Sequence, residues 1–203
     1  ATQVYLYRAK LDGSSAPERV TPANEPGSHS YSIAPGGRLA FHTVSRFDVP
    51  PVQTVVSLPA HRTLRALTDA SALSAKIAPL VKSPVEFFQV DIGSGVKIPL
   101  DGWMIKPTNF DPAKKYPVIV HVYGEPASQT VTDRWGGGRM LFHRALAEAG
   151  YLVVSFDNHG TPAPKGAEWR KKVYGTVGEL SAAEQALAVR RLTESRAYVD
   201  ASR

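Results

Sequence analysis

The chain of 203 residues contains no cysteine. Thiol nucleophiles, disulfides and zinc–thiolate sites are therefore excluded, whereas the redox state of the compartment stays open. Long apolar runs are also missing, because none approaches the roughly 18 residues of a membrane-spanning helix. The apolar fraction of 43% is nevertheless enough for a packed core, and it excludes a disordered chain.

A concentrated charge of one sign is absent as well. The net charge is +6, but residues 1–80 and residues 81–203 each carry three more basic than acidic side chains. The densest basic cluster, Arg170–Lys172, has only Trp169 and Tyr174 as neighbouring aromatic residues that could stack on a base. Since nucleic-acid binding needs a concentrated basic face, we expect no nucleic-acid partner.

Residues 1–80 are predicted to be entirely β-structure. Short strands alternate with turn-forming residues about every 8–12 residues, a spacing typical of a sandwich, a barrel or a propeller blade. The predicted strands are Val4–Tyr7, Glu18–Thr21, Tyr31–Ile33, Arg38–Val44, Val52–Ser57 and Thr63–Leu67. We expect Pro50–Pro51 to separate two of them. The first residues lack an initiator Met and the pattern of a signal peptide, and are expected to be a strand of a longer protein.

The pattern changes after a predicted boundary at residues 70–84, which contains a short helix over Ala72–Ala78. Val85–Asp91 and Lys97–Ile105 flank the glycines of Gly93–Gly95 and predict an antiparallel hairpin. Beyond the next loop the residues become strongly apolar, so the class of structure is expected to change from all-β to α/β.

Two apolar runs, Tyr116–Pro126 and Tyr151–Gly160, end abruptly in polar and turn-forming residues. Each is short and rich in Val and Ile, which predicts a strand buried on both faces. A helix is predicted between them over Gly138–Glu148. Strand, helix and strand form the unit of a parallel sheet, and such sheets carry their chemistry at the carboxyl ends of the strands. Tyr123 and Asp157 lie at these ends.

The rest of the chain is predicted to be a loop over Pro162–Gly166 and a helix over Glu179–Tyr198. The helix carries an apolar stripe on one side and arginines toward its end, where they complement the helix dipole. Residues 198–203 are then expected to lead toward a further strand.

Several motifs together resemble the prolyl oligopeptidase family of serine peptidases, in its dipeptidyl peptidase IV branch. They are Tyr31–Gly37, Phe47–Pro51, Val85–Phe88, Gly102–Pro107, Asn109–Pro117, Val122–Gln129, Asp133–Gly138 and Ser155–Pro162. The resemblance covers nearly the whole chain. It implies that residues 1–80 are the end of an all-β propeller domain and that residues 81–203 are the N-terminal half of an α/β-hydrolase domain.

The resemblance also implies a function for the whole protein. Such an enzyme removes dipeptides from peptide N-termini, with Pro or a small residue second, through a Ser/His/Asp triad and without a cofactor. The chain has no Gly-x-Ser-x-Gly motif, so the nucleophile and the other two triad residues are expected beyond Arg203, and the acidic pair that binds the substrate amino terminus before Ala1. The isolated chain is therefore expected to be inactive.

The partners follow from the same resemblance. They are a peptide substrate and the missing parts of the two domains, since one blade and a half sheet cannot bury their own faces. Family members are often dimers, which allows a homodimer here. Resemblance to bacterial members favours a periplasmic or secreted location, with the cytoplasm left open.

Tyr123 is the one catalytic residue that the resemblance assigns within this chain, as a hydroxyl donor to the oxyanion of the tetrahedral intermediate. The alternative is a tyrosine that caps a strand beneath a loop. Departures from the family pattern are Glu125 for a glycine, His159 for an arginine, and Ser181 and Glu184 for a Glu and an Asp. They keep open a non-catalytic relative that binds peptides or partners, and an acyl hydrolase on the same fold is a third hypothesis.

Other candidate residues have structural alternatives. His121 and His159 lie near strand ends and could face a cleft, although His121 is also expected in the sheet interior; His143 is expected to face solvent or a neighbouring domain. Asp157 is either a catalytic acid or a turn-forming residue. No metal site is expected at the remaining histidines, since no carboxylate stands at ligand spacing from them. These are His29, His42 and His61.

The glycines Gly136–Gly138 precede a predicted helix and suggest a phosphate cradle. The Lys-Ser/Thr of a P-loop and the spacing of a dinucleotide fingerprint are both missing, however. A flexible start of the helix is therefore the favoured interpretation.

Overall fold

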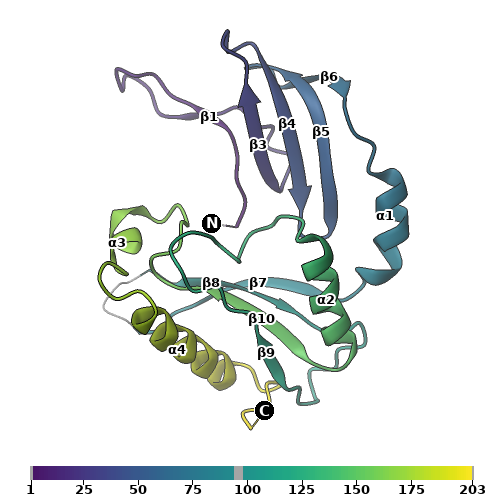
Figure 1. The fold of residues 1–203 in the computed structure, drawn as a ribbon, viewed down its shortest axis with the longest axis vertical. Coiled ribbons are helices and arrows are strands. Elements are labelled where there is room, and N and C mark those ends of the chain that lie inside the picture. The colour runs from purple at the N-terminus through teal and green to yellow at the C-terminus, as the bar shows by residue number, and fades with distance from the viewer. Residues whose placement is uncertain (1, 94–97, 203) are drawn as a thin grey trace. The chain divides into compact units, whose positions relative to one another are not determined.

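The computed structural model describes residues 2–93 and 98–202. The chain forms two compact units (Figure 1). The N-terminal unit contains Thr2–Pro79 together with Thr132–Gly137, and the C-terminal unit contains the described residues of Leu80–Val131 and 138–202. The short segment 132–137 thus belongs to the unit that precedes it by more than fifty residues in sequence.

The N-terminal unit is built on a four-stranded antiparallel sheet in the order β3-β4-β5-β6. Its strands are β3 (Ser28–Ile33), β4 (Leu39–Arg46), β5 (Val49–Ser57) and β6 (Arg62–Ala66). A two-stranded ribbon pairs β1 (Tyr7–Arg8) with β2 (Glu18–Arg19), and helix α1 (Ser71–Ile77) leads into a 3₁₀ turn, Ala78–Leu80. The predicted strands and the short helix are therefore confirmed in type.

Two predictions for this unit are wrong in detail. The strand expected over Val4–Tyr7 begins only at Tyr7, and Val4 makes a single parallel bridge to Ser28. Pro50 and Pro51 do not break the chain, because β5 runs through them. The register on β4 shifts just there, and β6 pairs with β5 only from Thr54 onward. One edge of β5 is thus unpaired at the prolines, where a missing N–H does no harm.

The C-terminal unit contains a mixed sheet in the order β7-β8-β10-β9. Its strands are β7 (Val85–Val90), β8 (Leu100–Ile105), β9 (Val118–Val120) and β10 (Leu152–Asp157). The predicted antiparallel pairing of β7 with β8 is confirmed, although most of the predicted turn, Ser94–Lys97, lies outside the described residues. Strands β9 and β10 are parallel, and helix α2 (Gly137–Glu148) lies between them in sequence, which confirms the strand–helix–strand unit.

Strand β9 corrects the expectation of two strands buried on both faces. All six residues of β10 are buried, but β9 has only three residues and each is half-buried. The difference follows from sheet order, since β10 has two neighbouring strands and β9 has one. Beyond β9, Tyr116 forms a parallel bridge with Val199, so the residues after the last helix begin to pair along its outer edge. This agrees with the predicted course of residues 198–203.

Helices α3 (Gly166–Lys171) and α4 (Glu179–Ser195) complete the unit (Figure 1). The sequence analysis missed α3. Helix α4 is confirmed but ends earlier than predicted, because Arg196 has an extended backbone. A core of large apolar side chains lies between α3, α4 and the sheet and includes Trp169, Leu152, Phe156 and Leu192. Within the described parts of the chain, no helix has the length and apolarity needed to cross a membrane.

Candidate functional site

The candidate site begins at the turn that follows β9. Tyr123 lies three residues beyond the end of the strand and is 42% exposed. Its hydroxyl makes no hydrogen bond to any residue that the structure describes, so the donor is available to a ligand. Gly124 follows with a φ of +80°, a left-handed conformation that glycine adopts without strain. The backbone therefore turns sharply just after the tyrosine.

Asn158 holds this turn from the neighbouring strand. Its side-chain amide donates to the carbonyl of Gly124 at 3.1 Å and to the carbonyl of His159 at 2.8 Å. Gln185 of α4 in turn donates to Asn158 Oδ1 at 3.2 Å and to the carbonyl of Phe156 at 2.9 Å. Because Asn158 and Gln185 are both buried, water competes little for these hydrogen bonds. The bonds therefore fix the orientation of the turn.

Asp157, the last residue of β10, fastens the next part of the same loop. Its carboxylate accepts hydrogen bonds from the backbone N–H of Thr130 at 2.8 Å and of Val131 at 3.2 Å, and also from the side chain of Gln129 at 3.2 Å. Burial raises the pKa of Asp157, and these hydrogen bonds oppose the rise. Asp157 is 1% exposed, so it is not accessible as a catalytic acid. Its carboxylate binds a distant loop and does not stabilise a turn of its own.

His159 is fully buried, so the expectation that it could face a cleft is wrong. Its backbone N–H donates to Glu184 Oε2 at 2.9 Å, and its Nδ1 lies 2.8 Å from Glu184 Oε1. The ring packs against Trp169 of α3 with 4.5 Å between ring centroids. Two of the departures from the family pattern, His159 and Glu184, are thus partners of each other. Together they connect the end of β10 to α4.

Residues Asp157, Asn158 and His159 therefore bind three different elements in succession. These are the loop 129–131, the turn at Gly124 and helix α4. Arg170 of α3 adds a fourth connection, because it donates to the carbonyls of Pro126 and Gly160. Its guanidinium thus has a structural use inside the predicted basic cluster.

The sequence analysis did not single out Asn158, Gln185 or the role of Arg170. The signal for Asn158 was its place directly after a buried strand, next to a residue already selected. Gln185 offered a weaker signal, as a polar residue on the otherwise apolar side of its helix. Arg170 gave none, because its acceptors are backbone carbonyls that no motif marks.

His121 and His143 form a second polar–aromatic cluster with Trp103. The two imidazole centroids are 4.7 Å apart, and that of His143 lies 5.5 Å from the indole of Trp103. Burial lowers the pKa of both histidines, to about 4 for His143, with further lowering by the charge of Arg139. His143 is 8% exposed, so the expectation that it faces solvent is wrong. Half-buried His121 lies just beyond β9 and donates its backbone N–H to Val154.

The histidines of the N-terminal unit lie in a separate cluster. His29 Nδ1 is 2.8 Å from His42 Nε2, and Tyr31 Oη is 2.8 Å from His61 Nε2. Over residues 2–93 and 98–202, no group of three or more His, Cys, Asp or Glu side chains is arranged to hold a metal ion. One pair of ring nitrogens makes this His29–His42 contact, and three others face Glu25 O, Thr54 Oγ1 and the Tyr31 hydroxyl.

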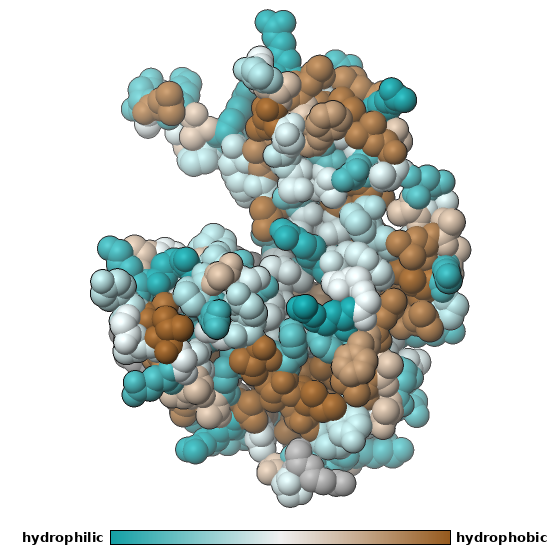
Figure 2. Space-filling model, viewed as in Figure 1, coloured by the Kyte–Doolittle hydropathy of each residue, from teal (hydrophilic) through white to brown (hydrophobic). Residues whose placement is uncertain are grey.

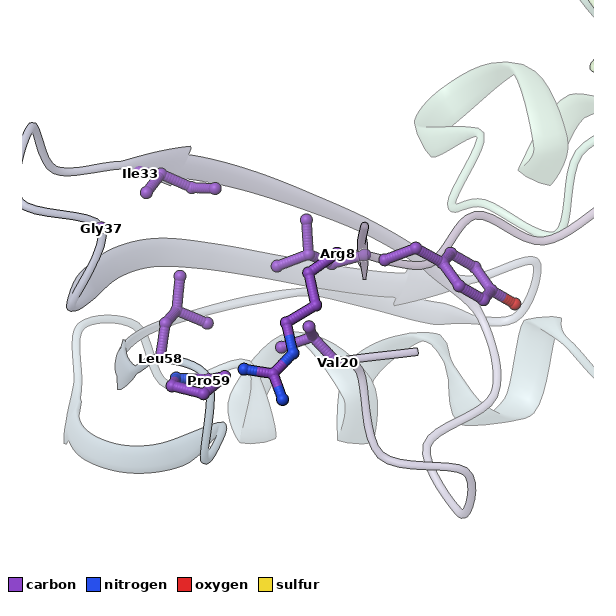
Figure 3. Close-up of a pocket in the computed structure, with 8 residues that line it drawn as sticks. Arg8, Val20, Ile33, Gly37, Leu58 and Pro59 are labelled. Carbon is purple, nitrogen blue, oxygen red and sulfur yellow. The ribbon is translucent and has the colours of Figure 1, made fainter. Parts of the chain in front are cut away.

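The N-terminal unit also has an apolar hollow of about 280 Å³. Figure 3 shows Arg8, Val20, Leu58 and Pro59 gathered around it. The guanidinium of Arg8 pairs with Glu18 at 2.6 Å, so its charge is already balanced. The lining has no other charged group, and the hollow offers little to orient a polar ligand.

The strands of the C-terminal unit and the polar residues at their carboxyl ends can be compared with those of known proteins. No family model matches the sequence. The chain is homologous along its whole length to dipeptidyl aminopeptidases, which confirms the resemblance, and its mixed sheets and few helices match a solved dipeptidyl peptidase 4.

Particular relatives are the probable dipeptidyl-aminopeptidases B of Emericella nidulans, 32% identical over 209 residues, and Coccidioides posadasii, 32% identical over 204 residues. Both alignments cover 100% of this chain. Dipeptidyl peptidase 4 of Porphyromonas gingivalis matches all of the chain with a TM-score of 0.85 and 29% identity. A candidate dipeptidyl aminopeptidase IV of Bacteroides ovatus matches 90% of the chain with a TM-score of 0.70 and 26% identity.

The chain spans only a part of each of these proteins. It covers 22% and 21% of the two dipeptidyl-aminopeptidases B, and 27% and 25% of the two solved chains. The chain therefore aligns with one part of each of these dipeptidyl aminopeptidases.

Proposed function

We propose that this chain is part of a serine-type dipeptidyl peptidase that removes N-terminal dipeptides of the Xaa-Pro or Xaa-Ala type. In this proposal residues 1–80 belong to the end of a β-propeller and residues 81–203 to the N-terminal part of an α/β-hydrolase domain. Whole-length homology to dipeptidyl aminopeptidases supports the activity. An antiparallel strand pair followed by a parallel strand–helix–strand unit supports the hydrolase assignment.

The observation that carries the proposal is the arrangement around Tyr123. The phenol lies beyond the carboxyl end of a parallel strand, is 42% exposed, and has no hydrogen-bond partner among the described residues. The backbone next to it is fixed, since Asn158 holds the carbonyl of Gly124. A fixed donor aimed at developing negative charge stabilises the transition state of acyl transfer. Tyr123 would therefore donate its hydroxyl to the oxyanion of the tetrahedral intermediate.

The nucleophile would come from a strand that continues beyond Val199. Tyr116 N donates to the carbonyl of Tyr198, and Asp200 N donates to the carbonyl of Tyr116, both at 2.9 Å. A strand that continued in this direction would run parallel to β9 and end at the same edge of the sheet as Tyr123. In hydrolases of this type a Gly-x-Ser-x-Gly turn follows such a strand, which would place its serine near the tyrosine hydroxyl.

A second candidate function is peptide or partner binding without catalysis. Glu125 favours it, because this exposed carboxylate stands two residues after the proposed oxyanion donor. A negative charge that approached the oxyanion would oppose its formation. The two functions differ in a simple way, since only the peptidase releases a dipeptide.

Hydrolysis of a Gly-Pro anilide by the full-length protein tests the proposal. We expect turnover by the wild type, a fall in kcat of about a hundredfold or more in Tyr123→Phe, and a small change in KM. The 203-residue chain alone should show no hydrolysis. Turnover that is unaffected by Tyr123→Phe would remove the assigned role, and binding of the anilide without turnover would favour the second function.

The proposal extends to the surroundings of the enzyme. A peptide substrate and the remaining parts of the two domains are its partners, and a homodimer and a periplasmic or secreted location are proposed with it. Sedimentation of the full-length protein and fractionation of the source cells would test these two points.

A further inference from the structure

A small polar pocket in the N-terminal unit has a different character from the candidate site. Its volume is about 230 Å³. Four hydroxyl side chains line it, together with Pro51 and two residues of the segment 132–137. The hydroxyl residues are Ser28, Ser30, Thr43 and Ser45.

The register of β3 on β4 explains why four hydroxyls meet. Ser28 stands opposite Ser45, and Ser30 stands opposite Thr43. Residues two apart on a strand share a face, so both pairs lie on the same side of the sheet. His29, which lies between Ser28 and Ser30 on β3, belongs to the histidine cluster instead. The hydroxyl of buried Ser28 has no hydrogen-bond partner within the described part of the chain. It could therefore donate or accept a hydrogen bond to a ligand at this face.

Segment 132–137 is held firmly beside these hydroxyls by Asp133. The buried Asp133 carboxylate accepts from the backbone N–H of Phe47 at 2.8 Å and from Gln3 Nε2 at 2.7 Å, and its own backbone N–H donates to the carbonyl of Thr2. The backbone N–H of Trp135 donates to Ser45 Oγ at 3.3 Å. Arg134 lies between these two anchored residues and reaches the pocket from a fixed backbone.

Arg134 supplies the only charge in the lining. It is exposed and makes no hydrogen bond or ion pair with any residue that the structure describes. The carboxylate next to it in sequence, Asp133, is already used by Phe47, by Gln3 and, at 3.7 Å, by Arg46. Arg8 at the apolar hollow differs in this respect, because its guanidinium is paired with Glu18.

We propose that this pocket binds a carboxylate of a peptide, either a C-terminal carboxylate or an acidic side chain. A guanidinium with an unused donor fork is suited to bidentate binding of a carboxylate, and hydroxyls add further donors. Trp135 and Pro51 provide an apolar wall for the atoms next to the carboxylate. The proposal needs no catalytic group and stands independently of the peptidase function.

Trp135 provides the reporter for the test. The chain has three tryptophans, and Trp103 and Trp169 are 2% and 0% exposed, whereas Trp135 is half-buried at the pocket. Three probes separate the sources of the carboxylate. Acetyl-Gly-Gly-Gly carries only a terminal carboxylate, acetyl-Gly-Gly-Glu-amide carries only a side-chain carboxylate, and acetyl-Gly-Gly-Gln-amide carries none.

We expect a saturable change in tryptophan emission with at least one carboxylate probe and none with the Gln-amide. Arg134→Gln should weaken binding at least tenfold, whereas the matched control Arg65→Gln, an exposed arginine of β6, should leave it unchanged. Trp135→Phe should remove the signal. Near-UV circular dichroism of each variant checks that the fold is kept.

Calorimetry on the full-length protein with the same probes and the same two arginine variants repeats the test without the reporter. Equal binding of the uncharged probe, or equal affinity of Arg134→Gln and wild type, would overturn the proposal. Absence of binding to the folded wild-type protein would also overturn it.

Discussion

The two units of this chain differ in the balance of apolar and polar side chains that they bury. In the C-terminal unit, helices α3 and α4 and the sheet enclose apolar side chains such as Trp169, Leu152 and Phe156. In the N-terminal unit, much of the buried material is polar and includes His29, His42 and Thr21. An apolar core tolerates changes of pH but not changes of volume, whereas a hydrogen-bonded core of histidines depends on their protonation.

Both units also expose large hydrophobic side chains. Figure 2 shows hydrophobic patches over both units. The exposed large apolar residues include Ile33, Leu39 and Phe41 of the N-terminal unit and Phe87, Phe142 and Val177 of the C-terminal unit. On β4 the exposed Leu39 and Phe41 alternate with the buried Ala40 and His42, so this strand directs its two large apolar side chains away from the histidine cluster. Exposed apolar side chains of this kind are suited to contact with another protein surface.

The largest expected effect tests the intolerance of the apolar unit to added volume. A Cβ at Gly160 would lie 2.4 Å from Val173 Cγ1 and 2.5 Å from Val173 Cβ, at a φ of +93°. Gly160→Ala should lower the free energy of unfolding by about 3 kcal/mol or more, through overpacking and the strained backbone together. Urea unfolding followed by far-UV circular dichroism measures it.

Gly150→Ala is the matched control for this change. Its φ is +99°, but no atom lies within 4 Å of the added Cβ. It should therefore lose only the backbone contribution, about 1–2 kcal/mol. Similar losses in the two variants would show that the contact with Val173 does not matter.

The next prediction concerns pH and the polar unit. Burial, His29 and His61 lower the pKa of His42 to about 4. Since the unfolded histidine titrates near 6.5, the unfolded state binds the extra proton first as pH falls. The stabilisation is therefore complete above about pH 6.5 and is lost between about 6.5 and 4, by on the order of 2–3 kcal/mol.

Histidine variants would locate that loss. Unfolding of each unit can be followed by amide exchange as a function of pH. In His42→Gln, the pH dependence measured in β3–β5 should become flatter. The pH dependence measured in β10 should be kept, because it comes from His143, whose pKa is also about 4. His143→Gln should do the reverse. If both variants flattened both regions, the two units would not unfold separately and the comparison between them would fail.

A smaller effect is expected where a charged residue organises the apolar unit. Asp157→Asn keeps the size of the side chain but offers one acceptor oxygen to the N–H groups of Thr130 and Val131. One backbone donor should lose its partner, which costs about 1–3 kcal/mol. Amide exchange at Thr130 and Val131 should accelerate more than at Val154. Uniform acceleration across the unit would mean that Asp157 supports the sheet as a whole rather than this loop.

The parts of this molecule that sequence reasoning found are those whose stability is local or periodic. Strand β10 and helix α2 carry apolar patterns that identify them without knowledge of their neighbours. Helix α3 was missed because its six residues, Gly166–Lys171, have no apolar period, and the helix is stabilised by the burial of one side chain, Trp169. The burial of His159 was missed for a related reason, since its partner Glu184 lies 25 residues away on another element.

Strand β9 is a case in which an apolar pattern was recognised but the degree of burial was not predicted. Its residues are as apolar as those of β10, yet only β10 is fully buried, because order within the sheet and not composition decides which strand has two neighbours. At the candidate site, Tyr123 could be selected from its motif. The group that holds the turn beside it, Asn158 with Gln185, depends on a contact between a strand end and a helix that only the fold brings together.

The smallest expected effect on stability is at Tyr123, and its size separates a functional tyrosine from a structural one. Its hydroxyl has no partner among the described residues, so Tyr123→Phe should change the free energy of unfolding by less than about 0.5 kcal/mol. Tyr116→Phe is the matched control, since the Tyr116 hydroxyl accepts the backbone N–H of Asp111 at 2.9 Å in a residue that is 8% exposed. Its removal should cost about 1–2 kcal/mol. If Tyr123→Phe were as destabilising as Tyr116→Phe, the Tyr123 hydroxyl would be a structural group, and a loss of activity in that variant would no longer identify an oxyanion donor.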